Sequence, residues 1–197
     1  MKPIKSIITV DRLANILYFL KKTNELPGDI AEFGVFNGGS LSFIAKNTPK
    51  HKQIYGIDSF EGLPKPRKGY DLHREGEFKA DYKSVLNRFS EFPNVRLIKG
   101  FFPNPEAEKI LKDTMFSFVH IDVDLYESDL NACRFFFPKM VKNGVMIFDD
   151  YRWVTTPGCK KAIDEYSSEN KEFIGKELRW GEKDKYSHFQ FLVIKSG

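Results

Sequence analysis

Two pairs of aspartates stand directly after apolar runs that are typical of buried strands. Asp122 and Asp124 belong to V-H-I-D-V-D-L-Y, and Asp149 and Asp150 belong to V-M-I-F-D-D-Y. Each pair is expected where a parallel strand leaves the core. Four carboxylates at one rim repel each other unless a cation lies among them, and oxygen ligands suit Mg²⁺ or Ca²⁺ better than Zn²⁺. The alternative is that each aspartate caps the helix or turn after its strand.

The spacing within the two pairs differs. Asp122 and Asp124 are two residues apart, so their side chains face the same way on an extended chain. Asp149 and Asp150 are neighbours, and within a strand they would point to opposite faces. They reach a common ion only if the chain turns at this point, which the end of a strand permits.

A glycine-rich segment offers a second place for chemistry. E-F-G-V-F-N-G-G-S places Gly34, Gly38 and Gly39 between a predicted strand and a predicted helix. Such glycines let the backbone approach a ligand, and the helix N-terminus offers free N–H groups, although similar turns without a ligand are common. The spacing differs from the dinucleotide fingerprint G-x-G-x-x-G, which argues against NAD. Asp58 ends the next predicted strand, where a carboxylate can accept both ribose hydroxyls, so an adenosine-like ligand such as S-adenosylmethionine is predicted.

These segments belong to a chain whose apolar patterns alternate between strand and helix. Strands are predicted over residues 29–35, 53–58, 94–100, 117–122 and 144–149. Helices are predicted over residues 8–22, 41–46, 80–90, 105–112, 127–137 and 158–168, the first with Asp11 as its N-cap. This alternation predicts a parallel α/β sheet with helices on both faces, which binds ligands beyond the carboxyl ends of its strands. Two further strand candidates, 171–178 and 188–194, lack a helix between them and are expected to pair antiparallel at one edge.

Length and composition predict one soluble globular domain over residues 1–197, in which residues 1–28 form an N-terminal helical extension. No apolar stretch approaches the length of a membrane span, and the N-terminus lacks the features of a signal peptide. Cys133 and Cys159 form no C-x-x-C motif, which fits a reducing cytoplasm. The cytoplasm is therefore the expected location, and no membrane partner is predicted.

The charge pattern argues against nucleic acid as a partner. The net charge of +4 is small, and the lysines are spread along the chain. The one local basic run, K-P-R-K-G-Y-D-L-H-R at 65–74, contains proline and glycine and is predicted to be a solvated loop, with contact to a phosphate-bearing substrate as the alternative. His120, within a predicted strand, is expected to be a core histidine with a backbone partner rather than a base.

Five blocks resemble, in order and spacing, the successive motifs of the macrocin O-methyltransferase family. They are E-F-G-V-F-N-G-G-S, G-I-D-S-F-E-G-L-P, K-G-F-F-P, H-I-D-V-D-L-Y-E-S and F-D-D-Y, and the match extends from about Gly28 to Tyr166. The family's members are metal-dependent enzymes that use S-adenosylmethionine to methylate sugar hydroxyls, including those of macrolide and aminocoumarin antibiotics. The resemblance implies a class I methyltransferase fold, a Rossmann-like three-layer sandwich with a mostly parallel seven-stranded sheet and an antiparallel edge strand. It also implies homo-oligomers, and a longer N-terminal segment in members that act on large antibiotics.

The resemblance further implies roles for individual residues. Asp122, Asp149 and Asp150 would hold Mg²⁺, and Asp124 would be the general base. The cofactor would be lined by Glu32, Gly34, Phe36, Asn37, Gly38, Ser40, Asp58, Ser59 and Phe60. Coordination of a hydroxyl to the cation lowers the pKa of that hydroxyl and fixes its direction. The cation also lowers the pKa of Asp124, so the metal must carry much of the activation.

Three functions remain open at this point. The leading hypothesis is a Mg²⁺-dependent O-methyltransferase that acts on a sugar or a glycosylated natural product. A catechol-like vicinal diol chelates a cation through two oxygens in the same way and is an alternative acceptor. A non-catalytic nucleoside-binding module of the same fold is the third, and it would be expected to have lost some of the four aspartates.

Overall fold

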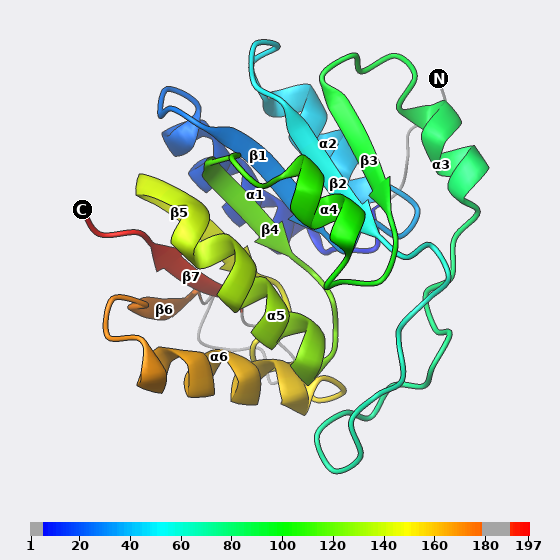
Figure 1. The fold of residues 1–197 in the computed structure, drawn as a ribbon, viewed down its shortest axis with the longest axis vertical. Coiled ribbons are helices and arrows are strands. Elements are labelled where there is room, and N and C mark those ends of the chain that lie inside the picture. Colours follow the sequence, from blue (N-terminus) through cyan, green and yellow to red (C-terminus); the bar gives the residue numbers. More distant parts are fainter. Residues whose placement is uncertain (1–5, 179–189) are drawn as a thin grey trace.

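The computed structural model describes residues 6–178 and 190–197, and every structural statement below refers to these residues. Seven strands form one sheet in the order β3-β2-β1-β4-β5-β7-β6 (Figure 1). The strands are β1 (Asp29–Phe33), β2 (Ile54–Asp58), β3 (Val95–Lys99), β4 (Phe116–Ile121), β5 (Met140–Phe148), β6 (Gly175–Leu178) and β7 (Gln190–Ile194). The helices are α1 (Val10–Thr23), α2 (Gly39–Asn47), α3 (Tyr82–Arg88), α4 (Pro105–Ile110), α5 (Tyr126–Phe136) and α6 (Pro157–Glu169), with a 3₁₀ turn η1 (Phe137–Lys139).

The pairing of the strands confirms the predicted fold class. Strands β1 to β5 pair in parallel, whereas β7 runs antiparallel to both of its neighbours, β5 and β6. The reversed strand therefore lies one position inside the edge, and β6 is the edge strand.

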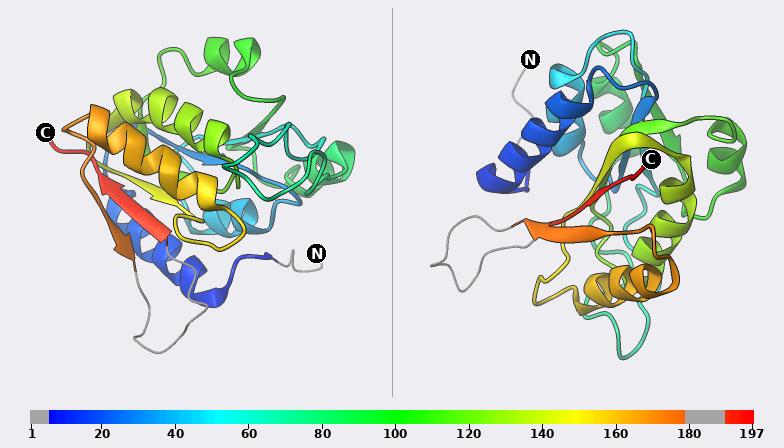
Figure 2. Two further views of the ribbon diagram at one scale, coloured as in Figure 1. Left: turned by 90° about the horizontal axis from the view of Figure 1, so that it is seen from below. Right: turned by 90° about the vertical axis from the view of Figure 1, so that its left-hand side faces the viewer.

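The helices cover both faces of the sheet and form a three-layer sandwich (Figure 2). On one face, Leu20 of α1 and Leu41 of α2 are fully buried in a cluster with residues of the sheet. On the other face, Phe136 of α5 and Ile163 of α6 pack in a second cluster. No helix among the described residues is long and apolar enough to cross a membrane. Cys133 and Cys159 are both buried and form no disulfide.

Most predicted elements are confirmed, and the differences have local causes. Strand β5 begins at Met140, four residues before its predicted start, because the Asn143-Gly144 pair forms a bulge rather than a turn. Asn143 adopts a φ of 64°, and the register between β4 and β5 shifts in this region. The N-cap of α1 is Thr9 rather than Asp11, which lies in the first turn. Residues 179–187, between the strand candidates 171–178 and 188–194, and the first two residues of the second candidate lie outside the described residues.

Hydrogen bonds between strand ends bring the chemically interesting residues to one edge of the sheet. The Asp122 N–H donates to the carbonyl of Phe33 (2.9 Å), and the Asp149 N–H donates to the carbonyl of Ile121 (2.9 Å). Gly34 follows β1 with a φ of 95°, and a Cβ at this position would lie 1.8 Å from the carbonyl oxygen of Asp122. Only glycine therefore allows the loop after β1 to pass this close to the loop after β4.

Candidate functional site

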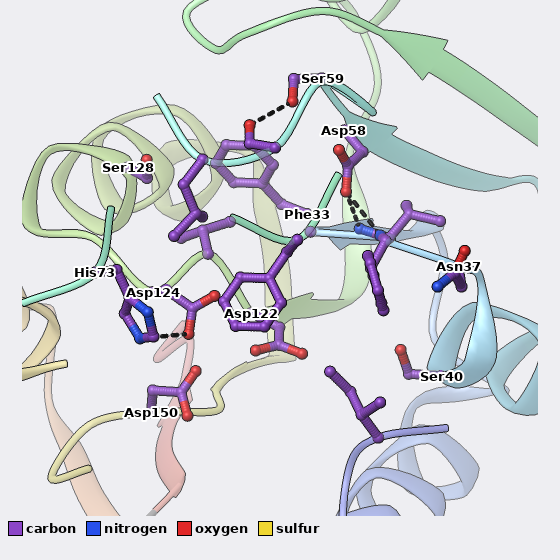
Figure 3. Close-up of a pocket in the computed structure, with 18 of the residues that line it drawn as sticks. Phe33, Asn37, Ser40, Asp58, Ser59, His73, Asp122, Asp124, Ser128 and Asp150 are labelled. Atoms are coloured by element: carbon purple, nitrogen blue, oxygen red, sulfur yellow. Dashed lines mark hydrogen bonds and ion pairs between the residues drawn. The ribbon is translucent and has the colours of Figure 1, made fainter. Parts of the chain in front are cut away.

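A cavity of about 270 Å³ lies at the carboxyl ends of the central strands (Figure 3). One side is formed by the loop after β1 and the end of β2, including Gly34, Ser40 and Asp58. The other side is formed by the loops after β4 and β5, including Asp122 and Asp150. The glycine-rich loop and the aspartates therefore face the same space, as the sequence predicts for a sheet of this type.

Three of the four aspartates form a compact cluster of carboxylates. Asp122, Asp149 and Asp150 each offer an oxygen that lies within 4.8 Å of the other two. Strand β5 ends at Phe148, and the chain turns directly afterwards, which is the condition for both neighbouring aspartates to reach one place. This set of oxygen donors fits a hard divalent cation.

Asp124 reaches the same cavity by a different route from the one predicted. The chain is not extended there, because Asp124 adopts the left-handed conformation with a φ of 60°. The Leu125 N–H donates to the carbonyl of Val123 in a tight turn (2.7 Å). Aspartate tolerates this conformation better than most residues, and non-glycine residues in such conformations are concentrated at functional sites.

Negative charge is in excess on the cavity side of this cluster. Burial and the charges of neighbouring carboxylates raise the pKa values of Asp122, Asp124 and Asp150. Each of these groups would hold its charge more readily beside a cation. The electrostatics therefore agree with the ligand chemistry: the residues present fit a bound Mg²⁺.

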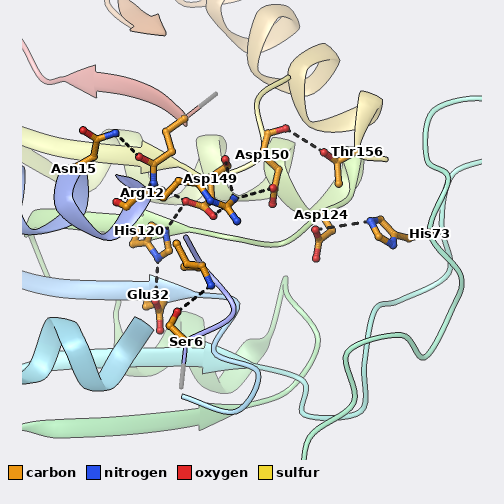
Figure 4. Close-up of polar contacts among 12 residues, drawn as sticks. Ser6, Arg12, Asn15, Glu32, His73, His120, Asp124, Asp149, Asp150 and Thr156 are labelled. Carbon is orange, nitrogen blue, oxygen red and sulfur yellow. Dashed lines mark hydrogen bonds and ion pairs between the residues drawn. The ribbon is translucent and has the colours of Figure 1, made fainter. Parts of the chain in front are cut away.

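Asp149 differs from the other three because protein groups neutralise its charge (Figure 4). The guanidinium of Arg12 forms an ion pair with its Oδ2 and lies 3.3 Å from Oδ1 of Asp150. Oδ1 of Asp149 accepts a hydrogen bond from the amide of Gln190 (2.6 Å) and lies 3.4 Å from Nε2 of His120. Burial alone would raise the pKa of Asp149, but these partners outweigh burial and lower it.

His120 is a core histidine, as predicted, but its partners are carboxylates rather than backbone groups. Its Nδ1 lies 2.9 Å from Oε1 of Glu32, and its Nε2 faces Asp149. All three side chains are almost completely buried. Burial favours the neutral imidazole, yet the two carboxylates outweigh it and raise the pKa of His120 to about 9. At neutral pH this imidazole is therefore protonated and unsuited to act as a base.

The predicted cofactor residues divide into two groups. Those that line the cavity are Gly34, Phe36, Asn37, Ser40, Asp58 and Ser59. Those that do not are Glu32, Gly38 and Phe60. Glu32 is turned into the core toward His120, Gly38 adopts a left-handed conformation as the N-cap of α2, and Phe60 is buried among apolar residues.

Asp58 lines the cavity and also organises the glycine-rich loop. Its Oδ2 accepts hydrogen bonds from the N–H groups of Val35 (2.8 Å) and Phe36 (2.7 Å). Its Oδ1 accepts one from the N–H of Phe60 (2.6 Å). The sequence predicted only ribose hydroxyls as partners of this carboxylate. Because a carboxylate can accept about four hydrogen bonds, these three bonds still leave room for a ribose hydroxyl.

Replacing Asp58 with alanine is expected to raise the Kd for S-adenosylmethionine by about 10- to 100-fold, because bonds to a charged acceptor contribute about 1.5–3 kcal/mol. Isothermal titration calorimetry measures this change. The matched control is Asp113→Ala at an exposed position that does not line the cavity. Equal affinity of wild type and Asp58→Ala would exclude both the ribose contact and the loop-organising role.

Two functional candidates were missed by reasoning from sequence. Arg12 lines the cavity from helix α1, and His73 lines it from the loop between β2 and α3. A signal for Arg12 was available, because it occupies the buried stripe of α1 together with Ile16 and Leu20, where an arginine requires a partner. For His73 no local pattern indicates a contact with a segment some fifty residues further along the chain.

The sheet order, the reversed strand and the position of the cavity define a class I methyltransferase fold. The chain is similar in structure to the O-methyltransferase NovP, with a TM-score of 0.76, 24% identity and coverage of 98% of this chain and 82% of that one. It is also similar to the calicheamicin methyltransferase CalS11, with a TM-score of 0.75, 20% identity and coverage of 93% and 78%.

Sequence comparison gives the family. The profile of the macrocin O-methyltransferase (TylF) family matches residues 4–180, and the chain belongs to this family. It is 30% identical over 179 residues to demethyldecarbamoylnovobiocin O-methyltransferase of Streptomyces niveus, covering 82% of this chain and 67% of that protein. It is 26% identical over 188 residues to mycinamicin III 3''-O-methyltransferase of Micromonospora griseorubida, covering 82% and 69%. These relatives are O-methyltransferases of natural products, as the resemblance of the five blocks implies.

Proposed function

We propose that this protein transfers a methyl group from S-adenosylmethionine to a hydroxyl of a sugar or glycosylated natural product, with Mg²⁺ as the metal. The observation that carries the proposal is that the glycine-rich loop and the aspartate cluster line the same cavity. Family membership supports the reaction class, and the activities that the two relatives are named for support a natural-product acceptor.

The cofactor side of the cavity suits a nucleoside that carries an amino-acid group. Asp58 faces the cavity and has room for a ribose hydroxyl. Helix α2 begins at Gly39, and its N-cap is Gly38. Glycine has no side chain that could accept hydrogen bonds from the free N–H groups of the first turn. Such a helix N-terminus favours a carboxylate. S-adenosylmethionine, when bound, would supply an electrophilic methyl group.

The acidic side of the cavity suits activation of a hydroxyl. Asp122, Asp149 and Asp150 would hold Mg²⁺, which, when bound, would act as a Lewis acid and orient the acceptor oxygen. Asp124 would accept the proton of the acceptor hydroxyl. Its side chain lies on the cavity wall and is 19% exposed, so an acceptor can reach it. Arg12 would hold Asp149 and Asp150 in place through its ion pairs with both carboxylates.

Turnover with a panel of acceptors tests this function. The panel contains simple 6-deoxyhexose glycosides, nucleotide-linked sugars and a catechol, and S-adenosylhomocysteine formation is measured with Mg²⁺ and with EDTA. We expect turnover of a sugar, an activity loss of about 100-fold or more in EDTA, and recovery when Mg²⁺ is restored. Full activity in EDTA would exclude the metal role. Turnover of the catechol alone would favour the vicinal-diol alternative, and cofactor binding without turnover of any acceptor would favour a non-catalytic module.

A further inference from the structure

The loop between β2 and α3 is attached to the start of helix α5, directly after the turn that carries Asp124. Asp71 of this loop makes the attachment. Its Oδ1 accepts a hydrogen bond from the N–H of Tyr126 (2.9 Å), and its Oδ2 accepts one from the N–H of Arg67 (2.8 Å). The loop extends away from the sheet toward the first residues of α5 and α6 (Figure 1). A single carboxylate therefore joins the loop to the helix.

Tyr126 is the first residue of α5, and its N–H needs an acceptor from outside the helix. The first N–H groups of a helix have no partner within it, and the N-cap residue Leu125 provides no side-chain hydrogen bond. The N–H of Asp129 is the one that donates to the carbonyl of Leu125 (3.0 Å). Asp71 supplies the missing cap from a position 55 residues earlier in the chain, where its negative charge also suits the helix dipole.

This cap lies two residues after a backbone position of unusual geometry. Asp124 adopts a φ of 60°, and the N–H of Leu125 donates to the carbonyl of Val123 (2.7 Å) within the same turn. Such a conformation persists only where the surrounding contacts fix it. On the helix side of the turn, the hydrogen bond between Tyr126 and Asp71 fixes the chain. The position of Asp124 therefore depends on Asp71.

The side chain of Arg67 adds to the same attachment. Its guanidinium carbon lies 4.3 Å from the ring centroid of Tyr70 and 4.8 Å from that of Tyr126. Its Nη1 donates to Oε1 of Glu127 (2.8 Å). The side chains of Arg67 and Glu127 are 44% and 54% exposed, and ion pairs this exposed contribute little to stability. The attachment therefore depends mainly on the half-buried Asp71.

Helix α6 leaves room for Asp71 because its second residue is glycine. A Cβ at Gly158 would lie 2.1 Å from Oδ1 of Asp71 and 2.9 Å from Cβ of Tyr126. Both distances are much shorter than van der Waals contact, so only glycine allows this close approach. Lys161 of the same helix lies over the ring of Tyr70, with Nζ 3.7 Å from the ring centroid. The loop, α5 and α6 thus meet at the Asp71 carboxylate.

The loop also forms part of the cavity wall. Pro64 and His73, which lie on either side of Asp71 in the sequence, line the cavity, and so does Asp124. Asp71 itself is not among the residues that line it. It can therefore affect a reaction in the cavity only through the residues that it holds in place.

Building on the proposed function, we propose that Asp71 is a positioning residue for methyl transfer. It caps α5 from the loop and thereby holds the Asp124 turn in the conformation that presents the Asp124 carboxylate to the acceptor hydroxyl. The residues assigned to S-adenosylmethionine lie on the other side of the cavity, where Asp71 makes no contact. Loss of Asp71 should therefore slow turnover and leave cofactor binding intact.

Kinetics of Asp71→Ala test the proposal, with Glu75→Ala at an exposed position of the same loop as the matched control. We expect Asp71→Ala to lower kcat by about 10- to 100-fold, because a displacement of about 1 Å can cost this much in rate. The Kd for S-adenosylmethionine and the acceptor KM should stay within about threefold, since binding groups are kept. An unchanged kcat, measured where circular dichroism shows the variant folded, would overturn the proposal.

A conservative variant separates capping from a general structural effect. Asp71→Asn keeps a carbonyl oxygen that can accept from the N–H of Tyr126, so it should recover most of the activity that Asp71→Ala loses. Equal losses in the two variants would contradict the capping role. Adding Asp71→Ala to Asp124→Asn should cause no further loss, because Asp71 acts through Asp124, and multiplied losses would contradict the proposal.

Gly158→Ala tests the same contact without changing the carboxylate. The added methyl group would displace Asp71 or the start of α5, so kcat should fall by about 10-fold or more while the Kd for S-adenosylmethionine stays unchanged. Full activity in Gly158→Ala would contradict the proposal.

Hydrogen exchange of the Tyr126 amide gives a readout that needs no acceptor. We expect this amide to exchange about 10-fold faster in Asp71→Ala than in the wild type, and Glu75→Ala should match the wild type. Equal exchange in Asp71→Ala and the wild type would overturn the proposal. A wild type with a protected Tyr126 amide that methylates no acceptor would instead overturn the proposed function, so the two failures are distinguishable.

Discussion

Replacing Asp124 with asparagine is expected to lower kcat about 10³-fold, while the Kd for S-adenosylmethionine changes by less than about twofold. Asparagine keeps the size of the side chain but cannot take a proton, and loss of a general base typically costs 10²- to 10⁴-fold in rate. The positive φ at Asp124 is also tolerated by asparagine, so the turn after β4 should persist.

Steady-state turnover and calorimetry of cofactor binding check this expectation, with Asp113→Asn as an exposed control. A weakened cofactor affinity with little change in kcat would move Asp124 from the role of base to that of a binding residue. If the affinity for Mg²⁺, measured directly by titration, fell by about as much as kcat does, Asp124 would instead be a metal ligand.

The second large effect concerns stability. Replacing His120 with leucine is expected to lower the free energy of unfolding by about 3–5 kcal/mol, because it leaves the buried Glu32 without its charged partner and removes one of the partners of Asp149, which keeps Arg12. Urea unfolding measures the change, and His51→Leu at the surface should stay within about 0.5 kcal/mol of wild type.

A compensating variant shows whether charge is the cause. Adding Glu32→Met to His120→Leu removes the carboxylate that this variant leaves unpaired and should recover part of the lost stability. Lack of any recovery would indicate that the loss comes from packing. A loss of less than about 1 kcal/mol in His120→Leu alone would show that the network contributes little to folding.

The fold could be predicted because its elements carry local patterns. Strands such as β1 (D-I-A-E-F) and β4 (F-S-F-V-H-I) consist mostly of apolar residues, and the turn chemistry around Gly34 shows where β1 stops. The prediction of β5 was too short because the strand passes through a bulge at Asn143, and its pairing with the neighbouring strands there is not visible in any local pattern.

The site could be predicted only in part, for a different reason. The four aspartates and Asp58 stand at strand ends, so the sheet alone brings them together. Arg12 and His73 reach the cavity from a helix and a long loop whose positions depend on packing far along the chain. The helical spacing of Arg12 with Ile16 and Leu20 shows that it needs a buried partner but not which one, and for His73 there is no such signal. Glu32 was placed beside the cofactor by resemblance, whereas its hydrogen bond to His120 turns it into the core.

The partners of Asp149 link completion of the aspartate cluster to a late step in the folding of the chain. One of its oxygens pairs with Arg12 and the other accepts from Gln190, two residues that are 178 positions apart in the chain. During synthesis on the ribosome, helix α1 emerges long before β7, so this carboxylate stays without its amide partner until Gln190 has been translated. Contacts of such wide separation form late. Nascent chains arrested ahead of Gln190 should therefore fail to retain Mg²⁺, and those arrested well beyond it should succeed.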